Sequence, residues 1–120
     1  MRRAHFRFED LEVWQRGAEI THSLCDIADD LEDRKRYRFA EQLRAAALSI
    51  PNNVAEGSGS QSKREFGQFL NIARRSAFEC ASMLLVFGKR HLVDEDLMDS
   101  ILGELDEECR MLLSFKRSLA

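Results

Sequence analysis

The sequence predicts an all-α protein, an antiparallel up-down-up-down four-helix bundle formed by residues 1–120 as a single domain. Apolar residues recur at steps of three and four along four stretches of about 20 residues, which is the period of one helix face. Short connections separate these stretches, so consecutive helices are expected to neighbour each other antiparallel. The chain has one proline and six glycines, and 44% of its residues are hydrophobic, a composition typical of a folded helical domain.

The first helix is expected from about Asp10 to Leu31. Asp10 suits the N-cap position, and Glu12 suits the positive end of the helix dipole. Residues at helical spacing form the expected core face: Leu11, Trp14, Ala18, Thr21, Cys25 and Ala28. A second apolar stripe recurs at steps of seven: Val13, Ile20 and Ile27. The charged run DDLEDRKRYR then breaks the period and is expected to be the connection to the next helix.

The second helix is expected from about Arg36 to Glu56, with a proline inside it. Its core line is Phe39, Leu43, Ala46, Ile50 and Val54. Pro51 has no N–H to bond the carbonyl of Ala47, so it should kink the helix. The amide of Asn53 is expected at the core edge, where it can bond a carbonyl that Pro51 frees. Gly57 is expected in the left-handed position just past the helix end.

The third helix is expected to start at Ser62, which forms an S-x-x-E capping box with Glu65. It should end near Gly88. Its core line is Phe66, Phe69, Ala73, Ala77, Cys80, Leu84 and Phe87. The fourth helix is expected from about Asp94, its cap, to about Ser118, with Val93 and Leu97 suited to a hydrophobic staple around that cap. Its inner line is Met98, Ile101, Leu105, Cys109 and Leu112.

Short motifs spread over nearly the whole chain carry a family resemblance. They are Phe8-Glu9-Asp10-Leu11 with Val13-Trp14-Gln15; Gln42-Leu43-Arg44 with Ala46; Ser49-Ile50, Asn53 and Ala55-Glu56-Gly57; and Glu65-Phe66, Phe69-Leu70, Ile72-Ala73, Ser76 and Glu79. Together they resemble the four-helix-bundle proteins encoded in intervening sequences of bacterial 23S ribosomal RNA. The resemblance implies a small cytosolic bacterial bundle, without enzymatic activity, that assembles as a ring of typically five subunits.

Two positions depart from the family pattern. Ala45 stands where the family often carries a second basic residue after Arg44, and Ala81 stands where it often carries glutamate. Accessory proteins of diversity-generating retroelements look similar and bind nucleic acid together with a reverse transcriptase. Each departure removes a polar group from the most recognisable region, which weakens the transfer of a nucleic-acid role to this chain.

The distribution of charge gives nucleic acid, RNA or DNA, as the alternative partner. Residues 34–90 hold 11 basic and 4 acidic side chains, although the chain as a whole has a net charge of −3. If the turn between the second and third helices is centred on Gly59, positions summing to about 118 lie level, which brings Arg44 level with Arg74. The predicted phosphate-contacting residues are Arg44, Arg74 and Arg75, extended near the turn by Lys63 and Arg64. The other interpretation is that the acidic first and fourth helices neutralise these charges.

Candidate catalytic and metal-binding residues are few. Glu19 and His22 form one E-x-x-H, whereas a di-iron bundle needs this motif on two helices. The loop GSGSQS could cradle an anion, but a flexible turn is the better interpretation because the Walker lysine spacing is absent. Asn53 and Glu56 suggest catalysis, but a structural role is favoured, with Glu56 pairing to a basic residue or a cap across the hairpin. We therefore expect that the protein has no enzymatic activity and binds no metal, cofactor or small-molecule substrate.

Self-association is the favoured function, with the chain as a structural or scaffolding ring protein. Phe78 and Leu85 lie seven residues apart on the third helix, outside its core line. Together with the extra stripe of the first helix they would expose an apolar patch unusual for a monomer. Three widely spaced cysteines indicate a reducing cytoplasm. No apolar run reaches the roughly 20 residues of a membrane span, and no apolar segment of a signal peptide follows the basic start.

Overall fold

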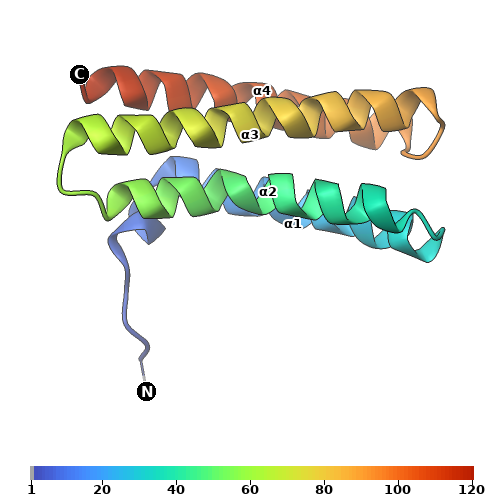
Figure 1. The fold of residues 1–120 in the computed structure, drawn as a ribbon, viewed down its shortest axis with the longest axis horizontal. Helices are drawn as coiled ribbons and strands as arrows, with labels where there is room; N and C mark the ends of the chain where they lie inside the picture. The colour runs from blue at the N-terminus through green and yellow to red at the C-terminus, as the bar shows by residue number, and fades with distance from the viewer. Residues whose placement is uncertain (1) are drawn as a thin grey trace.

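The protein is described by a computed structural model that covers residues 2–120. A short 3₁₀-helix precedes four long helices: η1 (Arg7–Asp10), α1 (Glu12–Asp33), α2 (Tyr37–Ser58), α3 (Lys63–Lys89) and α4 (Glu95–Ser118). The four long helices run up and down in succession, with α2 beside α3, α1 behind α2 and α4 behind α3 (Figure 1). Residues 2–120 contain no β-strand. The predicted all-α four-helix bundle is confirmed.

The seams between neighbouring helices are unequal. The α1–α2, α2–α3 and α3–α4 pairs pack extensively, whereas α1 and α4 make the sparsest of the four contacts. The core that these helices share is filled mainly by leucine, isoleucine and alanine side chains with almost no exposure to solvent. Val13, Ile20 and Ile27 of α1 belong to this core, so the prediction that they form a second, exposed apolar stripe is wrong. Trp14, Ala18 and Cys25, which were expected to form the core face of this helix, are only half-buried because the face that α1 turns to its neighbours is centred on the other stripe. None of the helices among residues 2–120 is both long and apolar enough to cross a membrane.

Helix starts follow the predicted caps in two of three cases. Ser62 Oγ accepts a hydrogen bond from the Glu65 N–H at 3.1 Å, and Asp94 Oδ2 accepts one from the Leu97 N–H at 3.0 Å. Asp10, in contrast, is not the N-cap of α1. It ends η1, its carboxylate lies 3.0 Å from His5 Nε2, and Leu11 precedes α1 instead.

The charged run after Leu31 forms less of a connection than the sequence suggested. Helix α1 continues through Asp33 and α2 begins at Tyr37, so only residues 34–36 connect them. The charged side chains at the helix ends are exposed and interfere with no packing. Lys35 adopts φ 65° in this turn, and His91 adopts φ 58° in the α3–α4 turn.

Gly57 does not occupy the left-handed position predicted for it. It lies inside α2, which ends only at Ser58, and among residues 2–120 no glycine has a positive φ. A Cβ built on Gly57 would lie 2.7 Å from Phe69 Cβ and 2.8 Å from Phe66 Cδ1. The glycine therefore permits close approach of α2 and α3, which is a packing requirement and not a conformational one.

Candidate functional site

Arg44 forms ion pairs with two acidic residues of α1 in the same chain. Its Nη2 donates to Asp29 Oδ1 at 2.6 Å and its Nη1 donates to Glu32 Oε1 at 3.0 Å, both on α1. Both hydrogen bonds raise the pKa of Arg44, and the bond to Asp29 has the larger effect. A phosphate group would have to displace two carboxylates to reach this arginine.

The α2–α3 register separates Arg44 from Arg74. Ser49 Oγ lies 2.7 Å from Ser76 Oγ, and the rings of Phe39 and Phe87 are 5.1 Å apart. Positions whose numbers sum to about 125 therefore lie level, and the prediction that Arg44 lies level with Arg74 is wrong. The two arginines are offset by about seven residues, or about 10 Å along the helix axes. Part of the cause is that α2 reaches Ser58, which moves the centre of the turn beyond Gly59.

The same register relates the two departures from the family pattern. Ala45 and Ala81 lie level across the α2–α3 seam, the first exposed and the second half-buried.

Arg74 packs against an aromatic ring. Its guanidinium carbon lies 4.8 Å from the centroid of the Phe78 ring, a cation–π contact. Its Nε is buried with no hydrogen-bond partner, and its backbone carbonyl lies 3.9 Å from the Cys109 Sγ of α4. Arg74 thus covers part of Phe78 on the α4 side of α3.

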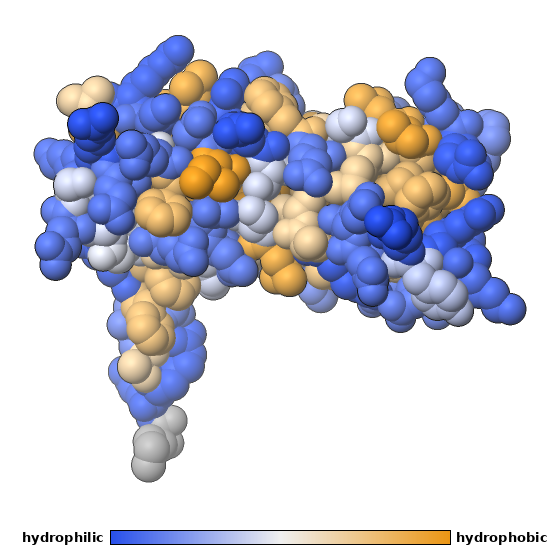
Figure 2. Space-filling model, viewed as in Figure 1, coloured by the Kyte–Doolittle hydropathy of each residue, from blue (hydrophilic) through white to orange (hydrophobic). Residues whose placement is uncertain are grey.

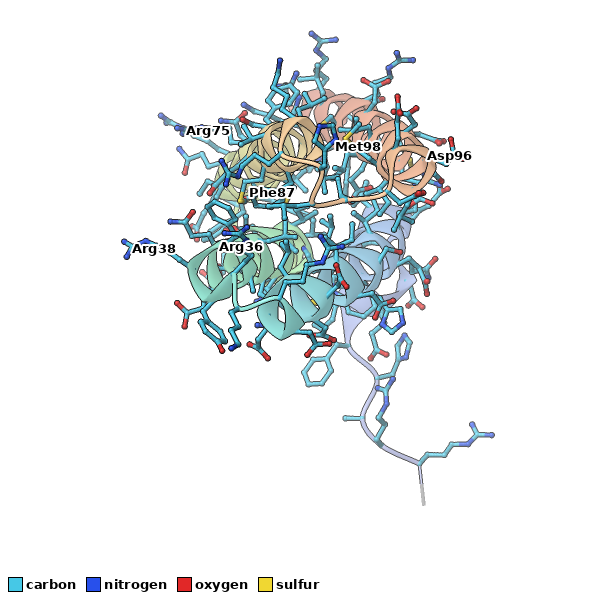
Figure 3. All side chains as sticks on the ribbon, turned by 90° about the vertical axis from the view of Figure 1, so that its right-hand side faces the viewer. Arg36, Arg38, Arg75, Phe87, Asp96 and Met98 are labelled. Atoms are coloured by element: carbon cyan, nitrogen blue, oxygen red, sulfur yellow. The ribbon has the colours of Figure 1, made fainter. Side chains whose placement is uncertain are left out.

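The remaining predicted cations are exposed and lie in two places. Arg75 projects away from α3 (Figure 3). Lys63 and Arg64 begin α3 and line a cavity together with Lys116 from the last turn of α4. None of these four side chains forms an ion pair within residues 2–120. The structure therefore divides the five predicted residues and does not place them on one track.

The carbonyl freed by Pro51 is covered by a residue other than the one predicted. Thr21 Oγ1 of α1 lies 2.9 Å from the Ala47 carbonyl oxygen, and also 2.8 Å from that of Gly17. Asn53 instead donates to the carbonyl and the hydroxyl of Ser49, at 2.7 and 2.8 Å. The prediction for Asn53 is wrong because its side chain faces α3, whereas the Ala47 carbonyl faces α1.

Glu56 remains without the partner expected for it. It is exposed on α2 and makes no hydrogen bond or ion pair through its side chain within the part of the chain that the structure describes. The α2–α3 turn is stabilised by other contacts, including the Ser58 hydroxyl, which donates to the Ala55 carbonyl at 2.7 Å.

Large apolar side chains are exposed on two opposite edges of the bundle. Phe78 and Leu85 are 52% and 50% exposed, and Leu85 lines a cavity together with Met98 of α4. Tyr37 and Leu48 are 57% and 48% exposed. Tyr37 lies seven residues before Arg44 and Leu48 lies four residues after it, so the three side chains share one face of α2. This face lies beside α1, because Arg44 pairs there with acidic residues of α1. We call these pairs the Phe78–Leu85 edge and the Tyr37–Leu48 edge.

The broad face between the two edges is mixed in character. Figure 2 looks onto α2 and α3 and shows apolar side chains interspersed with polar ones. This face includes the exposed Ile72 and Val86 of α3.

Glu108 of α4 is a buried acid that the sequence interpretation did not single out. Its side chain has no exposure to solvent, and neither carboxylate oxygen has a hydrogen-bond partner. Burial raises its pKa to about 8, against a smaller opposing effect from Arg16. A signal was present, because Ile101, Leu105, Glu108 and Leu112 follow core spacing with steps of four, three and four.

The candidates for metal or thiol chemistry lie apart. Glu19 and His22 are both exposed on α1, and residues 2–120 contain no group of three or more metal-ligating side chains. The three cysteines are free, and burial raises the pKa of Cys80 to about 12, which makes its thiol unreactive.

Comparison with known proteins places the chain in a family. A crystal structure of a protein of unknown function from the S23 ribosomal protein family of Bacteroides thetaiotaomicron VPI-5482 has the same fold, with a TM-score of 0.81 and 23% sequence identity over 85% of this chain and 95% of that one. No curated protein matches the chain. The family model for the 23S rRNA-intervening sequence protein matches residues 9–114. The chain belongs to the 23S rRNA-intervening sequence protein family.

Proposed function

We propose that this protein is a non-enzymatic structural subunit that associates head to tail with copies of itself. The observation that carries the proposal is the pair of apolar edges on opposite sides of one bundle. A contact between two different patches is heterologous, and its repetition closes a ring when the rotation between subunits divides a full turn. The family resemblance implies five subunits for such a ring.

The charges near the two edges are complementary. The Tyr37–Leu48 edge holds Asp29 and Glu32 of α1 together with the Arg44 that pairs with both, which leaves one net negative charge, whereas the Phe78–Leu85 edge carries Arg74. Across the molecule, α1 and α4 hold 14 acidic and 4 basic side chains, and α2 and α3 hold 4 acidic and 7 basic ones. Figure 3 shows part of this division, with Arg38 and Arg75 on the α2–α3 side and Asp96 on the α4 side. Opposite charge favours docking of unlike faces and disfavours docking of like ones.

A complementation experiment tests this proposal. Phe78→Glu removes one edge and Leu48→Glu removes the other, so each variant alone should be monomeric while retaining its helix content. When the two are mixed, each supplies the patch that the other lacks, and one intact contact should form a heterodimer. Light scattering after size-exclusion chromatography measures the mass in each case. Leu97→Glu, at an exposed apolar residue of α4 away from both edges, is the control and should keep the wild-type mass.

Two outcomes would contradict head-to-tail association. If only one of the two variants lost mass, the other edge would have no part in the contact. If both became monomeric and did not combine on mixing, the interface would be isologous, with the same patch on both partners.

The free cysteines fit a reducing cytoplasm, where we place the assembly.

Binding to RNA or DNA is the second candidate function. It is favoured by the cations without acidic partners at the start of α3 and the end of α4, where Lys63, Arg64 and Lys116 line one cavity. An oligomer would repeat this cluster in every subunit and so make a weak contact multivalent. The binding would rest on phosphate neutralisation, so it should fall steeply with salt and depend little on sequence. A salt-dependent titration, described in the Discussion, tests it.

A further inference from the structure

Glu108 lies where three helices meet. It projects from α4 toward Gly17 of α1, where a built Cβ would lie 3.0 Å from Glu108 Oε2, 3.2 Å from Ile50 Cγ2 and 3.6 Å from the Pro51 nitrogen of α2. That nitrogen carries no hydrogen and cannot donate to the carboxyl group. An ionised carboxylate held here without a donor would be strongly disfavoured.

The packing beside Glu108 is thin along the α1–α4 seam. One cavity opens toward the α3–α4 turn and is lined by Arg16, Ile20 and Glu104, among others. A second opens toward the chain termini and is lined by residues that include Glu12 and Met111. On α4, Glu108 lies between Glu104, which lines the first cavity, and Met111, which lines the second, in the sparsest seam of the bundle.

The charged groups around Glu108 are unevenly placed. From α1, Arg16 and Glu12 act on it with opposite effects on its pKa. From α2, the contact consists of Ile50 and Pro51, neither of which is charged. Toward α3, the titratable neighbours Arg74 and Cys80 lie beside the adjacent Cys109 thiol. On α4 itself, Glu104 and Glu107 are exposed.

Among residues 2–120, Arg16 is the cation whose charge acts on Glu108. Its Nη2 lies 2.9 Å from the exposed Glu107 Oε2, while its Nε is buried with no hydrogen-bond partner. The side chain therefore has one end paired at the surface and an unused donor inside the seam. Turning the guanidinium inward would exchange the exposed partner Glu107 for the buried Glu108.

We propose that Glu108 is a proton-operated latch of the α1–α4 seam. The protonated carboxyl group allows α4 to close against Gly17. Loss of the proton leaves a buried carboxylate, which draws Arg16 inward from Glu107 and admits water through the flanking cavities, so the seam loosens. Deprotonation opens the seam, and not the reverse, because burial favours the neutral carboxyl group in the closed bundle and exposure to water favours the charged form in the opened one. With the pKa raised to about 8, the change takes place on the alkaline side of neutrality.

The fluorescence of Trp14, the chain's one tryptophan, reports on this seam, because the indole packs against an apolar cluster that includes Leu112 of α4. Wild-type emission recorded from about pH 6 to about pH 9.5 should show a transition centred near pH 8. Glu108→Gln keeps the shape of the protonated side chain and should abolish the transition. Glu95→Gln removes an exposed carboxylate from the same helix and should leave the transition unchanged.

The proposal is overturned if wild-type protein shows no transition or if Glu108→Gln retains it. If Glu108→Gln does not fold, a carboxyl ¹³C NMR titration of the wild-type chain decides the matter. One glutamate signal titrating near pH 8, with shift changes along α1 and α4, supports the latch. Titration of every side-chain carboxyl group below about pH 6 overturns it.

Discussion

Replacing Gly57 with alanine tests how closely α2 and α3 must approach near their turn. The added Cβ would lie 2.7 Å from Phe69 Cβ and 2.8 Å from Phe66 Cδ1. The Phe69 atom is attached directly to the α3 backbone, so it cannot move aside by a change of rotamer. Gly57→Ala must therefore push the two helices apart or shift their register.

The expected magnitude combines two opposing effects. In an unhindered helix interior, alanine is more stable than glycine by about 1 kcal/mol. Overpacking a tight contact costs about 1–3 kcal/mol, and a contact with backbone-attached atoms belongs at the upper end. We expect Gly57→Ala to lower the free energy of unfolding by about 1–2 kcal/mol. Gly103 is the matched control, because nothing lies within 4 Å of a Cβ built there. Gly103→Ala should raise that free energy by about 0.5–1 kcal/mol.

Urea denaturation followed by circular dichroism measures both changes. The protein concentration must be the same for all variants, because association contributes to apparent stability. Opposite signs for the two glycines are the expected result. A Gly57→Ala variant as stable as wild type would refute the close approach of α2 and α3 described above.

Three further predictions follow from individual contacts. Thr21→Val leaves the Ala47 carbonyl without its 2.9 Å donor, so urea denaturation should show a loss of about 1–3 kcal/mol. Pro51→Ala supplies a backbone N–H to that carbonyl, so the double variant should lose less than Thr21→Val alone. The pKa of Glu108 is raised from 4.5 to about 8, so the folded state holds a proton that the unfolded state releases. Wild-type stability should therefore fall as pH rises between these values, by at most about 1.4 kcal/mol per pH unit, relative to Glu108→Gln. Structured RNA and duplex DNA should bind at about 50 mM salt and much more weakly at about 200 mM. Lys63→Glu combined with Arg64→Glu should abolish this binding, whereas Arg44→Glu should not. No binding at the lower salt, with the oligomer verified, would remove the nucleic-acid hypothesis.

Helix positions were predictable because each helix repeats its own signal many times. The apolar steps of three and four located all four helices to within two or three residues. The caps at Ser62 and Asp94 were also local, since each involves only residues three apart. At Asp10 the same local reasoning failed because Asp10 is the last residue of η1, which leaves Leu11 as the residue before α1.

Pairings between helices were not predictable because they depend on register and rotation. A shift of the α2–α3 turn centre by a few residues was enough to separate Arg44 from Arg74. The partners of Arg44 are 15 and 12 residues earlier in the chain, and no sequence period relates them. Gly57 followed the usual pattern of a glycine near a helix end, yet its role is set by two phenylalanines of another helix.

The burial of Glu108 was not predicted from the sequence, for a different reason. Its spacing with Leu105 and Leu112 places it on the inner face of α4. A charged residue at core spacing is usually assigned to the surface, because burial of an unpaired charge is costly. Here burial raises the pKa of Glu108 to about 8, so the side chain avoids a buried charge by holding a proton and not by pairing with a cation. Only the surroundings of the side chain in the folded protein reveal this.

The most direct test of self-association is the molar mass of the wild-type protein in solution. The chain has a mass of 13.9 kDa, and light scattering at micromolar concentration should give a discrete multiple of it, near five copies if the ring follows the family resemblance. That mass should be retained by Leu97→Glu and lost by Phe78→Glu. A wild-type protein of 13.9 kDa under these conditions would contradict the proposal that the two exposed apolar edges exist to bind each other.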